Sequence, residues 1–317
     1  MDVTLDTIQA ARSRIAGRVR RTPVLESETL NTLAGARLFF KCENFQDAGA
    51  FKARGATNAV FSLTEEALRA GVVTHSSGNH GAAVARAARL RGVRAQVVMP
   101  ENSSAAKLEA VRSYGAEVVL CAPTLAAREA TAAQIVARSG AVFIHPYDDP
   151  RVIAGQGTIA LELLEDVPDL DWLLMPVGGG GLASGVATAA KALRPSIRII
   201  AVEPAGADDA QRSFSSGRLA PPPQANTIAD GLRGALSART FDLIRRHVDD
   251  VVTVGEAAIV RAMRTLWQHL KIVVEASSAV PYAAVLDRII DVKDARVGII
   301  LTGGNVDLDA LPWIVKS

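Results

Sequence analysis

The sequence predicts an α/β fold in which parallel strands are covered by helices. Short β-rich apolar runs alternate with Ala-rich stretches of helical length along most of the chain. This alternation is typical of a parallel sheet, because each parallel strand needs a crossover connection to reach the next. Three of the apolar runs also lead into glycine-rich or polar turns, where ligand-binding residues are expected.

The first part of the alternation runs from Val72 to Ile144. Here we expect strands at residues 72–75, 95–99, 117–121 and 142–144, and helices at residues 80–91, 104–114 and 125–139.

The same pattern repeats after Arg151. Here we expect helices at residues 152–165 and 182–193, and strands at residues 171–177, 198–204 and 296–305. Residues 206–230 are predicted to form the longest irregular segment, a surface loop, because Gly, Ser and Pro are frequent there.

The composition suits a globular enzyme. The 317 residues, 49% of them hydrophobic, can bury one large core or two moderate ones. Thirty-five basic and 33 acidic residues leave a net charge of +2, and the Arg residues are scattered, so neither nucleic acid nor a membrane surface is a predicted partner. No signal-peptide pattern and no apolar stretch of about 18 residues is present, so we expect a soluble, cytoplasmic protein. Cys42 and Cys121 lie far apart, which argues against a disulfide framework or a zinc site.

Lys52 is the first candidate catalytic residue. It lies in the stretch FFKCENFQDAGAFKARGATNAV, after a strand and a glycine-containing turn and before a helix. An isolated lysine is normally a solvated charge, but Ala50, Phe51 and Ala53 surround this one with apolar atoms. Loss of water lowers the pKa of an amine and favours its neutral, nucleophilic form.

The stretch THSSGNHGAAVA is the second candidate, because it ends a strand and begins a helix with small and polar residues. The side chains of Ser76, Ser77 and Asn79, together with backbone N–H groups, suit a carboxylate. Simple capping of the helix is the alternative, and both interpretations remain open.

Four consecutive glycines, Gly178 to Gly181, form the third candidate between a buried strand and a helix. Glycine lets backbone amides approach a phosphate, whose charge is then stabilised by the helix dipole. The spacing is neither GxGxxG nor GxxxxGK[ST], so dinucleotide and nucleoside-triphosphate sites are not indicated.

Thr302 is the fourth candidate, in the stretch IILTGGNVD. It is either a plain residue at the end of a strand or a hydrogen-bond donor to a ring nitrogen.

Together these stretches, in this order and spacing, resemble the fold-type II pyridoxal-phosphate (PLP) enzymes. The resemblance is strongest to serine racemases, serine/threonine dehydratases and threo-3-hydroxyaspartate ammonia-lyases. It extends along the chain through the motifs TPVLES (22–27), IAGQGTIALE (153–162), TIADGL (227–232) and TGGNVD (302–307).

The resemblance implies two open twisted α/β domains of the tryptophan synthase β type, with PLP in the cleft between them. Residues 1–67 and 149–317 would form the large PLP-binding domain, and residues 68–148 a small mobile domain.

The resemblance also implies that Lys52 binds PLP as a Schiff base. The other implied cofactor-binding residues are Phe51 beside the ring, Asn79 at the ring O3′, Gly178, Gly179, Gly180 and Gly181 at the phosphate, Thr302 at the pyridine nitrogen, and Gly231 and Glu275. A hydroxyl at the pyridine nitrogen leaves the ring a milder electron sink, which suits elimination of a β-hydroxyl group.

The implied activity is an ammonia-lyase that converts L-serine, L-threonine or L-threo-3-hydroxyaspartate into a keto acid and ammonia. Lys52 would remove the Cα proton. The substrate carboxylate would be held by Ser76, Ser77, Gly78, Asn79 and His80. Because Ser77 matches the serine that racemases place on the opposite ring face, a serine racemase with dehydratase side activity is the alternative. A second alternative is a protein that binds PLP but catalyses no reaction.

Arg128 bears on the choice of substrate. It aligns with an arginine that the racemases turn toward a dicarboxylate, which favours a hydroxyaspartate-type substrate; a solvated helix arginine is the alternative. Ala50, where serine is common in the family, resembles the hydroxyaspartate ammonia-lyases.

The stretch VEPAGADD resembles the divalent-metal loop of the family. Glu203 and Asp209 would supply carboxylates and Ala207 a backbone carbonyl to Mg²⁺ or Ca²⁺. The family also implies a homodimer with a small amino-acid substrate. Asp47 and Ala48 match the nucleotide loop of animal serine racemases poorly, so activation by ATP is not expected.

Overall fold

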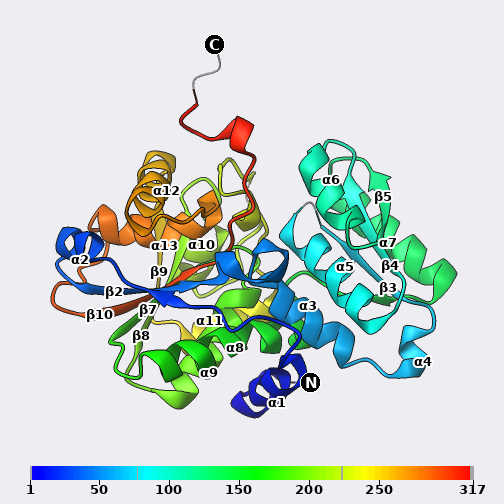
Figure 1. Cartoon of the computed structure of the whole chain (residues 1–317), viewed down its shortest axis with the longest axis horizontal. Helices are drawn as coiled ribbons and strands as arrows, with labels where there is room; N and C mark the ends of the chain where they lie inside the picture. Colours follow the sequence, from blue (N-terminus) through cyan, green and yellow to red (C-terminus); the bar gives the residue numbers. More distant parts are fainter. Residues whose placement is uncertain (1, 77, 223, 315–317) are drawn as a thin grey trace.

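The chain folds into two α/β halves that lie side by side, each built on its own sheet (Figure 1). The computed structural model describes residues 2–76, 78–222 and 224–314. Over these residues no helix combines the length and the apolar character needed to cross a bilayer.

The smaller half contains a four-stranded sheet whose paired strands are all parallel. Its strand order is β5 (Glu117–Cys121), β4 (Ala95–Pro100), β3 (Val72–His75), β6 (Val142–Phe143). The helices around it are α5 (Asn79–Arg91), α6 (Ala105–Arg112) and α7 (Leu125–Ser139). Each of these elements matches its predicted range to within two residues at either end, so the predicted α/β alternation is confirmed here.

The larger half contains a six-stranded sheet that is parallel except for its first pair of strands. Its order is β1 (Val24–Leu25), β2 (Arg37–Cys42), β10 (Arg296–Leu301), β7 (Trp172–Pro176), β8 (Arg198–Pro204), β9 (Asp250–Val254).

Helices cover both faces of this sheet. One core lies under α1 (Leu5–Ile15), α8 (Pro150–Asp166), α9 (Gly181–Leu193), α10 (Asp209–Ser216) and α11 (Ala238–His247). The other lies under α2 (Glu28–Ala34), α12 (Glu256–Leu270) and α13 (Ala276–Leu286). Along β7, Leu173 and Met175 enter the first core and Leu174 enters the second. Burial on both faces explains why these strands read as continuous apolar runs in the sequence.

Helix α3 (Lys52–Phe61) packs against α5 of the smaller half and α8 of the larger one, and the short helix α4 (Glu65–Leu68) follows it (Figure 1). The division of the chain at residues 68 and 148, and the mobility of the segment between them, stay predictions.

The prediction of an irregular segment over residues 206–230 is wrong in part, because α10 lies inside it. Both carboxylate oxygens of Glu203 accept hydrogen bonds from amides of the first turn, those of Ala210 and Gln211, at 3.2 and 3.0 Å. A residue outside the segment therefore stabilises the start of a helix whose own sequence is polar and rich in serine.

Two predicted boundaries also differ. The helix expected from residue 152 begins at Pro150, because the Asp149 side chain accepts a hydrogen bond from the Arg151 amide and proline suits the first helical position. The last strand ends at Leu301, and the Gly-Gly turn lies beyond it.

Candidate active site

Lys52 lies at the first position of α3, next to the end of β10. The amide of Phe51 donates a 2.9 Å hydrogen bond to the carbonyl of Thr302, and Ala50 forms an isolated bridge with Gly303. The turn before Lys52 is thus held to the turn after the last strand, which brings the first and fourth candidate stretches together.

The Lys52 amine is partly buried and donates a 2.8 Å hydrogen bond to the carbonyl oxygen of Pro146. Its nitrogen also lies 5.1 Å from the centroid of the Phe51 ring. Burial lowers the pKa of Lys52 from 10.5 to about 8, although the charge of Glu275 opposes this change. Roughly a tenth of such amines are neutral at pH 7, far more than for an exposed lysine.

The four glycines follow β7 and open α9. A Cβ atom on Gly179 would lie 2.4 Å from the ring of Tyr147, and one on Gly181 would lie 2.9 Å from Tyr147 Cβ. Gly180 has a φ of +83°, a conformation that other residues rarely adopt. Because Tyr147 directly follows Pro146, the glycines and the Lys52 amine meet the same short segment.

Asn79 and Glu275 join the two halves of the molecule. The Asn79 side-chain amide donates to both carboxylate oxygens of Glu275, at 3.0 and 3.1 Å, and its oxygen accepts a 3.0 Å bond from Asn305. Burial raises the pKa of Glu275 to about 7, so this carboxyl is close to half protonated at neutral pH.

The Thr302 side chain is buried and lies 3.1 Å from the hydroxyl of Ser278. Ser278 donates to the carbonyl of Gly303 at 2.6 Å, so Thr302 is the donor of the pair. Donation by Thr302 to a ring nitrogen therefore requires its hydroxyl to rotate away from Ser278. Nearby, the Gly231 amide donates to Ser277 at 3.1 Å, which ties the turn around Gly231 to the start of α13.

The candidate carboxylate loop joins β3 to α5. The Ser76 hydroxyl accepts a 3.1 Å bond from the Gly78 amide, and a Cβ atom on Gly78 would meet nothing within 4 Å. Burial lowers the pKa of His80 well below 6.5, so His80 is neutral, and its Nε2 lies 3.2 Å from the carbonyl of Ile144. Ser77, the predicted acid on the opposite ring face, lies outside the described residues.

Arg128 lies in the first turn of α7. Among the described residues its Nε atom is buried without a hydrogen-bond partner. Burial lowers the pKa of His75 to about 4, and the charges of His145 and Arg128 contribute. The Arg128 charge therefore lies close to His75, the last residue of β3.

Residues 15–303 match the family model described as pyridoxal-phosphate dependent enzyme. The chain belongs to this family. It is 50% identical over 310 residues to the beta-hydroxyaspartate dehydratase of Paracoccus denitrificans, with 98% of each sequence covered. The structure of maize serine racemase has a TM-score of 0.95 and 48% identity, covering 98% of this chain and 95% of the other. The structure of serine racemase from Dictyostelium discoideum has a TM-score of 0.92 and 50% identity, covering 96% of this chain and 99% of the other. The predicted family, fold class and enzymatic nature are confirmed.

The residues of this PLP enzyme fit the cofactor of its family. A partly buried amine with a lowered pKa can attack an aldehyde. The glycines at the start of α9 leave no room for a side chain but present the backbone of a helix N-terminus, which suits a phosphate.

The predicted metal ligands lie after β8. Glu203 and Asp209 are both buried, and burial raises the pKa of Glu203 to about 8 and also raises that of Asp209. Asp209 accepts from the Leu236 amide at 2.9 Å, but its Oδ1 is buried without a partner in the part of the chain that the structure describes. Neither carboxyl forms an ion pair among the described residues, and two such buried groups fit a divalent cation. No cluster of three or more His, Cys, Asp or Glu side chains suited to a metal occurs in the described ranges, so carbonyls and water would have to complete such a site.

The part played by His145 and the Pro146 carbonyl was not predicted from the sequence. His145 Nδ1 accepts hydrogen bonds from the amides of Tyr147 and Asp148, at 3.3 and 2.8 Å, and so shapes the turn that directs the Pro146 carbonyl. The sequence HPYDDP after a strand carries a turn signal, but a backbone carbonyl has no signature of its own.

Proposed function

We propose that this PLP enzyme is an ammonia-lyase that removes the β-hydroxyl and the amine of L-threo-3-hydroxyaspartate, L-serine or L-threonine. The observation that carries the proposal is the Lys52 amine, which has a lowered pKa and donates to Pro146 beside the glycine run. The 50% identity with a beta-hydroxyaspartate dehydratase and the likeness to a threonine deaminase of known structure support it.

Lys52 would hold the cofactor covalently, and the first turn of α9 would hold its phosphate. The further cofactor-binding residues in this proposal are Phe51, Asn79, Gly178, Gly179, Gly180, Gly181, Gly231, Glu275 and Thr302. When bound, pyridoxal phosphate supplies an electron-withdrawing ring that stabilises the negative charge left at Cα after proton removal.

In this proposal Lys52 is the general base. Once the substrate amine has taken its place, the Nζ atom is free to accept the Cα proton, and its pKa of about 8 suits proton transfer near neutral pH. The hydrogen bond to the Pro146 carbonyl would orient Nζ after the substrate amine has displaced it. The same nitrogen can then protonate the departing β-hydroxyl group, so that water leaves.

The substrate carboxylate would bind at the start of α5, through Ser76, Ser77, Gly78, Asn79 and His80. The first amides of a helix have no partners within the helix and carry partial positive charge. His80 is neutral and contributes no positive charge. The substrate carboxylate would therefore be attracted by the partial charge of the helix amides and by the Ser76 hydroxyl.

Arg128 supports a dicarboxylic substrate. An arginine that is partly buried and has a buried, unpartnered Nε among the described residues is suited to a second carboxylate. This favours hydroxyaspartate over serine and threonine.

Racemisation of serine is the second candidate function. The 48% identity with maize serine racemase favours it, as does Ser77 in the carboxylate loop. A racemase would return a proton to the opposite face of Cα instead of losing the hydroxyl.

We also propose that Glu203, Ala207 and Asp209 bind Mg²⁺ or Ca²⁺. Burial raises the pKa of both carboxyls, and a divalent cation between them would stabilise their ionised forms, which supports this proposal. The homodimer stays a prediction from the family resemblance.

The decisive experiment incubates the pure holoenzyme with L-serine, D-serine, L-threonine and L-threo-3-hydroxyaspartate. Keto acid and ammonia are measured, together with the chirality of the remaining amino acid. We expect keto acid release, fastest from hydroxyaspartate. D-serine from L-serine without keto acid would establish the racemase instead, and no change in any substrate would leave a PLP-binding protein without turnover.

A further inference from the structure

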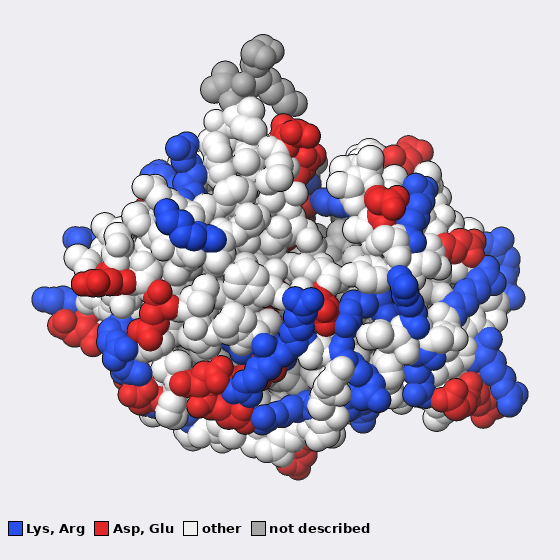
Figure 2. Space-filling model, in the orientation of Figure 1, with Lys and Arg blue, Asp and Glu red and all other residues white. Residues whose placement is uncertain are grey.

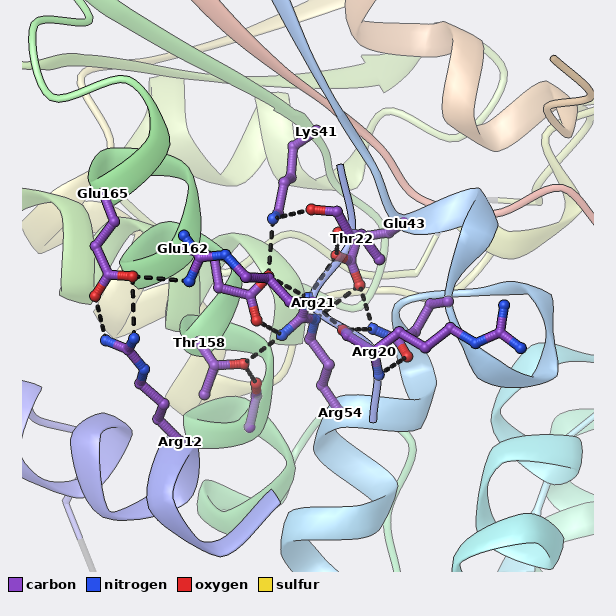
Figure 3. A network of polar contacts seen from close by, with 12 residues as sticks. Arg12, Arg20, Arg21, Thr22, Lys41, Glu43, Arg54, Thr158, Glu162 and Glu165 are labelled. Atoms are coloured by element: carbon purple, nitrogen blue, oxygen red, sulfur yellow. Dashed lines mark hydrogen bonds and ion pairs between the residues drawn. The ribbon is translucent and has the colours of Figure 1, made fainter. Parts of the chain in front are cut away.

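A group of buried charges surrounds Arg54, which follows Lys52 by two residues in α3 but is not part of the candidate active site (Figure 3). The Arg54 guanidinium contacts both oxygens of Glu43 at 2.8 Å and both oxygens of Glu162 at 2.7 and 2.8 Å. Its Nη1 also lies 3.3 Å from the Thr158 hydroxyl. The side chains of Arg54 and Glu43 have no solvent exposure, and that of Glu162 is 11% exposed.

Lys41 completes the group. Its amine donates to Glu162 at 2.8 Å and to the carbonyl of Thr22 at 2.7 Å, and the Thr22 hydroxyl donates to Glu43 at 2.5 Å. Burial alone would raise the pKa of Glu162, but the hydrogen bond and the charge of Arg54 lower it, so Glu162 is ionised. Arg54 and Lys41 therefore face Glu43 and Glu162, and Asp166, 3.8 Å from the Lys41 amine, is itself bound by Arg21.

These contacts fix α3 against α8. Further along α3, the Gly55 amide donates to the Gln156 side chain at 3.1 Å, and the Asn58 side chain donates to the carbonyl of Arg151 at 2.7 Å. As the residue number rises along α3 it falls along α8, so the two helices run antiparallel. A Cβ atom on Gly155 would lie 2.6 Å from the Cα of Gly55, which means that the two backbones touch.

The same two helices lie next to the two partners of the hydrogen bond between the Lys52 amine and the Pro146 carbonyl. Lys52 begins α3, and Pro146 lies in the turn that leads into α8 at Pro150. The position of the Lys52 amine relative to its acceptor therefore depends on how α3 and α8 are held together.

We propose that Arg54, through its paired contacts with Glu43 and Glu162, is a positioning residue that sets the place of the Lys52 amine. This inference rests on the proposed role of Lys52. Buried ion pairs often add little net stability compared with apolar residues of similar volume, so stability alone gives no reason for this group. A planar guanidinium with two bidentate partners fixes direction as well as distance, which an apolar contact does not.

Removing Arg54 alone would leave two buried anions facing one cation and could unfold the chain for that reason. The test therefore uses Arg54→Met combined with Glu43→Gln, which leaves Lys41 and Glu162 as a neutral pair. Arg54→Lys keeps the positive charge but loses the planar guanidinium that binds both carboxylates bidentately. Arg21→Met is the matched control, because Arg21 binds Glu165 and Asp166 at the exposed rim of the same network (Figure 3).

Three properties of each full-length variant are measured. The first is the melting temperature of the holoenzyme, and the second is kcat and KM, determined separately. The third is the rate at which the cofactor-free chain takes up pyridoxal phosphate, followed by absorbance at a series of pH values. The third readout reports on the Lys52 amine even if none of the tested amino acids is a substrate, so it separates this inference from the proposed function.

For the double variant we expect a melting temperature near that of the wild type, a kcat that is roughly 10- to 100-fold lower, and KM within about 3-fold. The pH midpoint of cofactor uptake should move to a higher value in the double variant. In both kcat and this midpoint, Arg54→Lys should lie between the wild type and the double variant. A double variant with wild-type kcat and uptake would overturn the inference and leave Arg54 as a balancing charge. If the double variant does not fold, Arg54→Lys is the test. Wild-type kcat and cofactor uptake in Arg54→Lys would overturn the inference in the same way.

Discussion

The amine of Lys52 donates a 2.8 Å hydrogen bond to the carbonyl oxygen of Pro146, 94 residues further along the chain. Tyr147, the next residue, packs against Gly179 and Gly181. One short turn between β6 and α8 therefore contacts both the candidate base, Lys52, and the glycines of the candidate phosphate-binding site. The turn lies where the two halves of the molecule meet, and a notch separates the halves along the upper edge of the face in Figure 2.

Lys52→Ala should abolish covalent binding of the cofactor and reduce turnover to the background rate. Without Nζ there is no amine to attack the aldehyde and no base at Cα. Absorbance of the bound cofactor and a keto acid assay check this, with circular dichroism to show that the fold is kept. Lys293→Ala, at an exposed position, is the control, and turnover by Lys52→Ala would remove Lys52 from the mechanism.

Gly179→Ala should weaken cofactor binding by about 10-fold or more, because the new Cβ would lie 2.4 Å from the Tyr147 ring. The dissociation constant is measured by equilibrium dialysis. Adding Tyr147→Ala should restore part of the loss, since it frees the space. Gly255→Ala is the control, because a Cβ there meets nothing within 4 Å. Unchanged affinity in Gly179→Ala would show that the phosphate does not depend on this contact.

Arg128→Met should raise KM for L-threo-3-hydroxyaspartate by roughly 10- to 100-fold, the worth of a charge-assisted hydrogen bond. KM for L-serine should change by less than about 3-fold, because serine has no second carboxylate to bind. Steady-state kinetics with both substrates make the comparison. Arg138→Met, on the exposed face of the same helix, should alter neither value; equal losses for both substrates in Arg128→Met would contradict a role in selectivity.

Glu275 should make the cofactor-free chain less stable as the pH rises. Burial raises the pKa of Glu275 from 4.5 to about 7, so the folded state favours the protonated form. Its contribution is fully present below pH 4.5 and is lost as the pH rises through 7, which amounts to roughly 3 kcal/mol. Urea unfolding between pH 4.5 and 8 should therefore show a smaller loss in Glu275→Gln than in the wild type. Parallel curves for the two proteins would refute the raised pKa.

Removal of divalent cations should lower the melting temperature, because a cation that binds Glu203 and Asp209 only in the folded chain stabilises that state. A chelator followed by excess Mg²⁺ or Ca²⁺ tests this in a thermal scan. The shift should vanish in Asp209→Asn, which keeps the size of the side chain but not its charge. A wild-type protein that is indifferent to both additions has no metal at this place.

The strands and helices of the smaller half were predictable because each strand is a short apolar run between helical stretches. Helices α1 and α2 lack that signal. The start of α1 is stabilised by a capping box of Thr4 and Thr7, and the start of α2 by the side chain of Ser27. Helix α10 could not be predicted from its own residues, since its first turn is completed by Glu203.

The candidate site was predictable where it consists of contiguous motifs, as around Lys52 and the four glycines. Contacts between distant parts of the chain were not. Arg54 looks like an ordinary helix charge until the fold brings Glu162, 108 residues away, to within 2.7 Å. The Pro146 carbonyl is a backbone atom, so no residue type marks it.

The contact between Gly55 and Gly155 limits how the sequence can change over evolution. A methyl group at Gly155 would push α8 away from α3 and shift the Lys52 amine with it, although neither glycine is a candidate substrate-binding or cofactor-binding residue. Deep mutational scanning should therefore find these two positions as intolerant as the lysine itself. A survey of variation that looked only for reactive side chains would overlook them.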